Sequence, residues 1–160
     1  MTKKAFILDL DDTLFIAKPI LEELNRRNFS SQEEFWQAFH DVVDQEKLDD
    51  NCYSLVKLFI SLGWRPIIST ARSEEIYRKT FACIKRFAPI LAQANPIILM
   101  RAYNDTSPSQ EVKAEHLRHI ICNLGFDVQV ALDDDIDNVK MFKKYGTPVI
   151  RWCTISEDED

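Results

Sequence analysis

The chain has 160 residues, of which 46% are hydrophobic and 11% aromatic, and this is enough apolar material for the core of one domain. Its formal net charge is −6, but the last four residues, Glu157 to Asp160, carry four of these negative charges. The overall charge therefore excludes no class of substrate.

The sequence predicts neither a membrane span nor a secretory leader. No apolar run approaches the roughly 18 residues of a membrane helix, and the start, Met1 to Lys4, leads directly into a strand pattern. The four cysteines are scattered without a CxxC pair, which favours reduced thiols. We therefore expect a cytoplasmic protein with no membrane partner, and the oligomeric state stays open.

Strand and helix patterns alternate along the chain. A buried strand at 6–8 is followed by helical patterns at 19–27, 35–43 and 55–62. The remaining predicted elements are strand 65–70, a helix from Ser73 to 88 stopped by Pro89, strand 96–100, helix 110–124, strand 127–132, helix 136–145 and strand 148–152. Candidate helix caps are Ser30 or Ser31 with Glu33 or Glu34, Asp49 or Asp50, Ser73 and Ser109.

Three glycines punctuate this pattern. Gly63, Gly125 and Gly146 each follow a helical pattern and precede a β-rich run. Glycine just past a helix end supplies the left-handed backbone that closes the helix. Repeated units of helix, glycine and strand predict an α/β fold with a parallel sheet.

Acidic and hydroxyl side chains stand where predicted strands end. Asp9, Thr70 and Asp133 each follow such a strand, and Asp134 extends the second acidic cluster. A parallel sheet gathers these positions at one edge. Carboxylates brought together raise one another's pKa, and a hard divalent cation would relieve this repulsion; an oxygen-rich site suits Mg²⁺.

These motifs resemble those of the haloacid dehalogenase superfamily of phosphotransferases. Asp9-Leu10-Asp11-Asp12-Thr13 resembles its DxDxT motif, Thr70 its strand ending in Ser or Thr, Lys113 its lysine near a helix start, and Asp133 to Asn138 its DDxxxN motif. The resemblance implies a three-layer, Rossmann-type domain with about five parallel strands. It would cover residues 1–153, with a small helical insertion at about 15–60 instead of a large cap, followed by an acidic disordered tail at 154–160.

The resemblance also implies roles for individual residues. Asp9 would be the nucleophile and Asp11 the general acid/base, while Thr70 and Lys113 would bind and neutralise the phosphoryl group. Mg²⁺ would be held by Asp9, the main-chain carbonyl of Asp11, Asp133 and, through water, Asp134. Asp137 and Asn138 would be supporting or helix-capping groups, and Arg72 and Arg101 would bind the rest of the phosphorylated substrate.

The second half of the chain has a closer resemblance, to the 3′-phosphatase domain of phage polynucleotide kinase–phosphatase. Residues 96–152 are similar throughout, and 15–60 only loosely. The resemblance implies a polynucleotide 3′-phosphate end or a nucleotide as substrate, in a nucleic-acid repair setting. Asp135 stands where that phosphatase has an arginine, and Asp12 replaces the usual glycine of the first motif. A kinase half is not expected, because the sequence has no GxxxxGK[ST] loop.

Other interpretations stay open at this point. A small-metabolite phosphatase would use the same residues, and a phosphoryl-accepting receiver domain also uses Asp, Thr and Lys. The DxDxT motif favours turnover over a lasting phosphoryl mark, and a non-catalytic binding domain would be expected to have lost Asp9 or Asp11. For His116 and His119, three apart on one helix, a half-buried or solvated face is the favoured interpretation.

Overall fold

A parallel sheet forms the middle layer of the molecule. The structure is a computed structural model that describes residues 2–154, and within this range five strands pair in the order β5-β4-β1-β6-β7, all parallel. The strands are β1 (Lys3–Leu8), β4 (Arg65–Ser73), β5 (Ile97–Arg101), β6 (Phe126–Asp133) and β7 (Val149–Arg151). The predicted α/β fold with about five parallel strands is confirmed.

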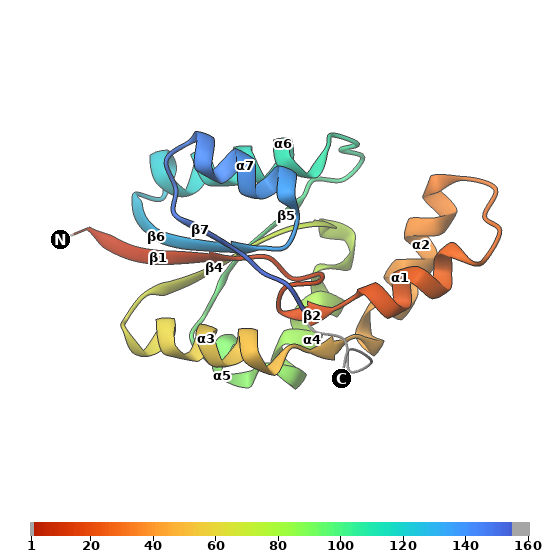
Figure 1. Cartoon of the computed structure of the whole chain (residues 1–160), viewed down its shortest axis with the longest axis horizontal. Helices are drawn as coiled ribbons and strands as arrows, with labels where there is room; N and C mark the ends of the chain where they lie inside the picture. The colour runs from red at the N-terminus through yellow and green to blue at the C-terminus, as the bar shows by residue number, and fades with distance from the viewer. Residues whose placement is uncertain (1, 155–160) are drawn as a thin grey trace.

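Helices cover both faces of this sheet (Figure 1). One face carries α6 (Ser109–Arg118), its π-helical continuation η3 (His119–Asn123) and α7 (Ile136–Lys144). The other carries α3 (Asp50–Ser61), α4 (Tyr77–Phe87) and α5 (Pro89–Gln93). Each helical layer buries its apolar stripe against the sheet, which gives the expected three-layer arrangement.

From Ala5 onward, the central strand β1 is buried on both faces. Phe6 and Leu8 pack into the core on the side of α3, α4 and α5, whereas Ala5 and Ile7 pack on the side of α6 and α7. Successive side chains of a strand point to opposite faces, so a strand covered on both faces reads as a continuous apolar run. This burial explains why residues 6–8 are uniformly hydrophobic.

A small helical insertion is present, but it is shorter than the expected 15–60, because α3 packs against the sheet instead of belonging to it. It contains α1 (Lys18–Asn25), α2 (Gln32–Val42) and the 3₁₀ turn η1 (Val43–Gln45). A short antiparallel ribbon of β2 (Phe15–Ile16) and β3 (Lys47–Leu48) ties its two ends together. In Figure 1, α1 and α2 project from the carboxyl edge of the sheet, where the strands end. The insertion therefore stands beside the predicted site.

Most predicted boundaries hold, including the helix ends at the three glycines, where Gly63 has a φ of 79° and the other two are also left-handed. Ser31 caps α2 and Asp49 caps α3. Ser73 caps the 3₁₀ turn η2 (Glu74–Ile76), which directly precedes α4.

One cap prediction was wrong, and two helix ends show added detail. The helix expected to stop at Pro89 does so, since α4 ends at Phe87 with Ala88 as its cap; Pro89 then begins the separate, short α5, because proline is tolerated in the first turn of a helix. Ser109 does not cap its helix; the preceding Pro108 occupies that position. The helix expected over 110–124 changes to π-helical hydrogen bonding at His119.

Two further expectations concern the ends of the chain and the membrane. Residues 155–160 of the predicted acidic tail lie outside the described residues. No helix in the part of the chain that the structure describes is long and apolar enough to cross a membrane.

Candidate active site

Three carboxylates meet where β1 and β6 end. Asp9 follows β1, and its backbone N–H donates to the carbonyl oxygen of Leu132 at 3.0 Å, so the strands stay paired up to the site. One oxygen from each of Asp9, Asp133 and Asp134 lies within 4.8 Å of the others. The adjacent parallel strands thus bring together residues that are more than a hundred positions apart.

Lys113 reaches into this group from α6. Its Nζ donates to Oδ1 of Asp9 at 2.7 Å and also to Oδ2 of Asp133, and the side chain is buried. Burial alone would lower the pKa of Lys113, but the two carboxylates outweigh it and hold the pKa above its ordinary value. The site therefore contains a fixed ammonium ion between two acidic groups.

One ammonium does not balance three carboxylates. Burial, and then the charge of Asp9, raises the pKa of Asp133 to about 6 and that of Asp134 to about 8. Asp133 still accepts hydrogen bonds from the backbone N–H of Asp135 at 3.0 Å and from Nδ2 of Asn138 at 3.1 Å. The Thr13 hydroxyl lies 3.4 Å from Oδ1 of Asp134, and a side-chain hydrogen bond with Asp9 contributes to the raised pKa of Asp134. This excess of closely spaced carboxylate oxygens fits a hard divalent cation such as Mg²⁺.

Thr13 fixes the other oxygen of Asp9. Its buried hydroxyl donates to Oδ2 of Asp9 at 2.9 Å. With Lys113 on Oδ1, both carboxylate oxygens of Asp9 are held in place. The sequence motif contained Thr13, but sequence reasoning gave it no role of its own.

Thr70 lies on β4, the other neighbour of β1. Ile68 pairs with Leu8, which places Thr70 at the same edge of the sheet as Asp9. Its hydroxyl is buried and accepts a hydrogen bond from the backbone N–H of Arg72 at 3.1 Å. The expected gathering of strand ends is therefore present, while the role of Thr70 in phosphoryl binding stays a prediction.

Asp11 is held by a buried arginine. Nε of Arg72 lies 3.0 Å from Oδ2 of Asp11, and Nη2 lies 2.6 Å from Oδ1. Nη2 also donates to Oε2 of Glu46 at 2.7 Å, and Arg72 is only 4% exposed. Burial would raise the pKa of Asp11, but the guanidinium reverses this and lowers it.

Glu46 was missed by sequence reasoning. It lies between η1 and β3, in a stretch rich in charged residues and without helical or strand periodicity. Burial and the neighbouring Asp11 raise its pKa to about 10. A buried acidic residue in the insertion, in contact with a site arginine, has no signal in a single sequence.

Arg101 contacts main-chain oxygens. Its Nε donates to the carbonyl of Ala71 at 2.9 Å, and its Nη1 donates to the carbonyls of Asp105, at 3.2 Å, and Ser107. These bonds fasten the loop after β5 to β4. The guanidinium groups of Arg72 and Arg101 are thus both engaged with protein oxygens, and their assignment to substrate binding stays a prediction.

Two further aspartates stabilise helix starts near the site. Asp12 adopts a left-handed backbone with φ of 57°, and its Oδ1 accepts from the backbone N–H groups of Ala17 at 2.9 Å and Lys18 at 2.7 Å. Asp135 caps α7 by accepting from the backbone N–H groups of Asp137 and Asn138. Asp12 therefore replaces the motif's usual glycine at a position where the backbone is left-handed.

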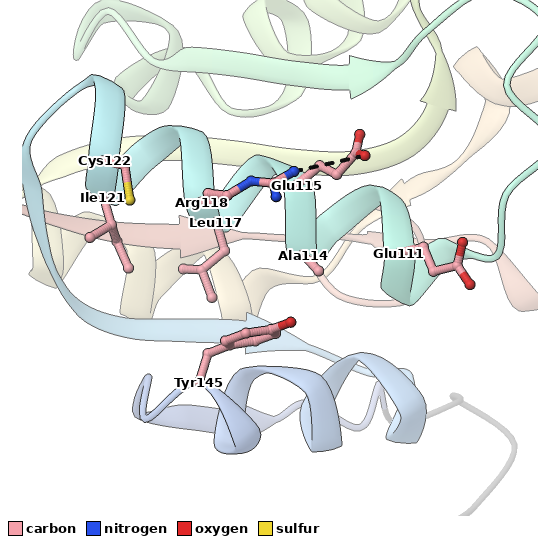
Figure 2. A pocket seen from close by; sticks show the side chains of 8 residues that line it. All are labelled: Glu111, Ala114, Glu115, Leu117, Arg118, Ile121, Cys122 and Tyr145. Atoms are coloured by element: carbon pink, nitrogen blue, oxygen red, sulfur yellow. Dashed lines mark ion pairs between the residues drawn. The ribbon is translucent and has the colours of Figure 1, made fainter.

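A pocket of about 480 Å³ lies elsewhere, between α6 and the end of α7 (Figure 2). Its wall includes Leu117 and Ile121, with Tyr145 across from α6 and an ion pair of 3.9 Å between Arg118 and Glu115. The walls come from α6, η3 and the end of α7 and not from the strand ends. This pocket is separate from the carboxylate site.

Comparisons with known proteins agree with this geometry. The model of the polynucleotide kinase PNKP phosphatase domain matches residues 3–153. A search of curated proteins found no match.

Solved structures share the fold. A chain of the Pnkp1/Rnl/Hen1 complex superposes with a TM-score of 0.68 at 22% identity, covering 94% of this chain and 46% of that one. A chain in a second structure, of the Pnkp1/Rnl/Hen1 RNA repair complex, superposes with a TM-score of 0.70 at 22% identity, covering 94% of this chain and 42% of that one. CbbY from Rhodobacter sphaeroides, in complex with phosphate, superposes with a TM-score of 0.63 at 15% identity, covering 99% of this chain and 90% of that one.

The chain thus spans less than half of the repair-complex chains that it matches. At these identities the superpositions show a shared fold. The family follows from the domain model, which covers nearly the whole chain and includes Asp9, Lys113 and Asp133. The chain belongs to the polynucleotide kinase phosphatase-domain family of the haloacid dehalogenase superfamily.

Proposed function

We propose that residues 1–153 form one Mg²⁺-dependent phosphomonoesterase domain that works through an aspartyl-phosphate on Asp9. The main support is the Lys113 ammonium between Asp9 and Asp133, beside a third carboxylate, Asp134, that has no cationic partner among residues 2–154. This arrangement holds a nucleophilic carboxylate at a site able to bind a divalent cation.

Asp9 attacks phosphorus. Lys113 and Thr13 hold its carboxylate from both sides, which fixes its orientation before substrate binds. An Asp9 oxygen forms a bond to phosphorus while the bond to the leaving alcohol oxygen breaks. Mg²⁺, held by Asp9, the Asp11 carbonyl, Asp133 and Asp134, would supply Lewis-acid charge neutralisation to the phosphoryl oxygens. Thr70 would donate a hydrogen bond to one of those oxygens.

Asp11 acts first as the general acid and then as the general base. Without substrate its pKa is lowered, so the carboxylate is ionised. An incoming phosphate adds negative charge nearby, which raises the pKa of Asp11 and favours the acid form that protonates the leaving oxygen. The resulting carboxylate then takes a proton from the water that attacks the aspartyl-phosphate, and this restores Asp9.

The proposed substrate is a polynucleotide 3′-phosphate end or a nucleotide. Support comes from membership of the polynucleotide kinase phosphatase-domain family and from the likeness to a chain of an RNA repair complex. A cytoplasmic nucleic-acid repair role goes with this proposal. A small-metabolite phosphatase is the second candidate, because the fold is shared with CbbY in complex with phosphate.

A substrate panel tests both proposals. The protein is incubated with Mg²⁺ and 3′-phosphorylated oligonucleotides, 5′-phosphorylated oligonucleotides, mononucleotides or sugar phosphates, and released phosphate is measured. We expect release from the 3′-phosphorylated oligonucleotide, and loss of at least about 10³-fold in Asp9→Asn, which removes the nucleophile.

Asp127→Asn is the matched control, because it makes the same substitution at an exposed site near the amino end of β6. It should retain wild-type activity. Equal activity in wild type and Asp9→Asn, or no release from any substrate, would refute the phosphatase. A preference for sugar phosphates would refute only the polynucleotide part.

A further inference from the structure

The helical insertion contributes a side chain to the acid/base site. Glu46, at the carboxyl end of η1, is 4% exposed, and its Oε2 lies 2.7 Å from Nη2 of Arg72. The same Nη2 lies 2.6 Å from Oδ1 of Asp11, and Arg72 itself is 4% exposed. One guanidinium nitrogen thus joins a residue of the insertion to the proposed general acid/base, and the carboxyl groups of Glu46 and Asp11 are also hydrogen-bonded to each other.

Glu46 and the loop that contains Asp11 are both held in place by backbone contacts. The ribbon pairs Ile16 with Lys47, the residue after Glu46. The loop that contains Asp11 is fixed at its far end, where the backbone N–H of Phe15 donates to the carbonyl of Leu10 at 2.9 Å. Lys79 of α4 donates to the carbonyls of His40 and Asp41 at the end of α2, which fastens the insertion to the core. The ribbon and the contacts of Lys79 in α4 therefore hold the segment that contains Glu46 next to the DxDxT loop.

Glu46 is the second carboxyl partner of Arg72, and it is buried. Nη1 of Arg72 has only a long contact of 3.5 Å with the Thr80 hydroxyl, whereas Nη2 is shared between Asp11 and Glu46. A guanidinium bound to Asp11 alone could rotate with that carboxylate. Glu46, a second and buried partner on a separate element, fixes the plane of the Arg72 guanidinium and with it the direction of the Asp11 carboxyl group.

We infer that Glu46 is a positioning residue that acts through Arg72, and through its own contact with Asp11, to orient Asp11 for protonating the leaving oxygen. The insertion thereby takes part in the acid step of the reaction. This inference rests on the proposed function, because it assigns Asp11 its acid/base role.

Leaving groups of different basicity distinguish positioning from general structural support. A 3′-phosphorylated oligonucleotide releases an alkoxide-like oxygen that needs a proton from Asp11, whereas p-nitrophenyl phosphate releases a stable phenolate that does not. The parameter kcat/KM reports the steps up to transfer of the phosphoryl group to Asp9, so it isolates the acid step from later hydrolysis.

The test compares wild type, Glu46→Ala and Glu46→Gln with both substrates. We expect Glu46→Ala to lower kcat/KM about 10- to 100-fold for the oligonucleotide, the size of effect seen when an outer partner of a site residue is lost. For p-nitrophenyl phosphate we expect less than about a threefold loss. Glu46→Gln keeps an oxygen acceptor for Nη2 and should restore most of the oligonucleotide activity.

Glu23→Ala is the control, since Glu23 is an exposed glutamate of the same insertion and is paired with Arg27. It should match wild type with both substrates. Thermal unfolding of each variant verifies folding, and if Glu46→Ala does not fold, Glu46→Asp replaces it, because its shorter side chain withdraws the acceptor from Arg72. Equal losses with both substrates, or no loss in a folded variant, would overturn the inference. If wild type hydrolyses neither substrate, the proposed function fails and the inference with it.

Discussion

The Ser69 hydroxyl lies 2.8 Å from Nδ1 of His116, and Nε2 of the same ring lies 3.2 Å from the carbonyl oxygen of Met100. A ring nitrogen that faces a carbonyl must donate, so Nε2 carries the hydrogen and Nδ1 accepts from Ser69. Ser69 precedes Thr70, and His116 lies one turn after Lys113. A neutral histidine therefore joins α6 to β4 and β5 close to the site.

This histidine predicts a pH dependence of stability. Burial lowers the pKa of His116 from 6.5 to about 4. As pH falls, the unfolded chain binds a proton at this histidine before the folded chain does. The contribution of neutral His116 to stability is therefore complete above pH 6.5 and is lost between pH 6.5 and about 4. Over this range we expect the free energy of unfolding of wild type to fall by as much as about 3 kcal/mol more than that of His116→Asn. Urea unfolding at a series of pH values measures the difference, and parallel profiles for the two proteins would contradict it.

The carboxylate site predicts opposite effects of Asp134→Asn with and without metal. Burial and Asp9 raise the pKa of Asp134 to about 8, so at neutral pH the folded protein keeps this side chain mostly protonated while the unfolded chain leaves it ionised, and this difference costs stability in the folded state. Without metal, the variant should melt at a higher temperature than wild type. With Mg²⁺ at a hundred times its dissociation constant, wild type should gain about 2.7 kcal/mol, and the variant clearly less. Thermal unfolding with EDTA or Mg²⁺ gives both values, and Asp127→Asn should behave like wild type in each.

Lys113→Met tests the balance of charge at the same site. Methionine has a similar length but leaves Asp9 and Asp133 facing each other without the ammonium. Breaking a buried ion pair by removing one partner costs roughly 3–5 kcal/mol, so the metal-free protein should lose stability on that scale. Because Mg²⁺ also neutralises these carboxylates, it should stabilise the variant more than wild type. Equal stabilisation of both proteins would argue against a metal site between these carboxylates.

The sequence predicted the parts of the site that depend on backbone topology. Asp9 and Asp133 follow apolar runs, and parallel strands that are neighbours in a sheet bring such positions together. Gly63 ended its helix as expected, because the left-handed φ at that position favours glycine. Local rules were enough for these features, since each depends on a few adjacent residues.

Features that depend on distant side chains could not be predicted in this way. Glu46 is buried because Arg72 lies against it, 26 positions further along the chain, and nothing in its own neighbourhood signals this. Arg72 was assigned to substrate, but its pairing with Asp11 joins residues 61 positions apart. The strands β2 and β3 have two residues each, which is too short for an alternating pattern.

Asp12 predicts an unusual order of stabilities among its variants. Its backbone is left-handed and its carboxylate accepts two hydrogen bonds at the start of α1. Asp12→Ala loses both bonds and keeps the backbone strain, so it should be the least stable, by about 1–3 kcal/mol. Asp12→Gly loses the bonds but removes the strain, and Asp12→Asn keeps an acceptor. Urea unfolding should therefore rank wild type and Asn above Gly, and Gly above Ala; an alanine variant as stable as the glycine variant would show that the strain is negligible.

Two helix caps of the same kind predict different costs because one is buried. Asp49 is 7% exposed, and it accepts from the backbone N–H of Cys52 at 2.9 Å and from Nε1 of Trp152 at 3.1 Å. Ser31 is exposed and accepts only from the backbone N–H of Glu34, at 3.2 Å. Ser31→Ala should cost about 1 kcal/mol, the usual value for a lost cap. Asp49→Ala should cost about 2–4 kcal/mol, because it also leaves the indole N–H without its acceptor, while Asp49→Asn should keep most of the stability. Chemical denaturation of the three variants measures these costs, and equal losses for the two alanine variants would show that the bond to Trp152 contributes nothing to stability.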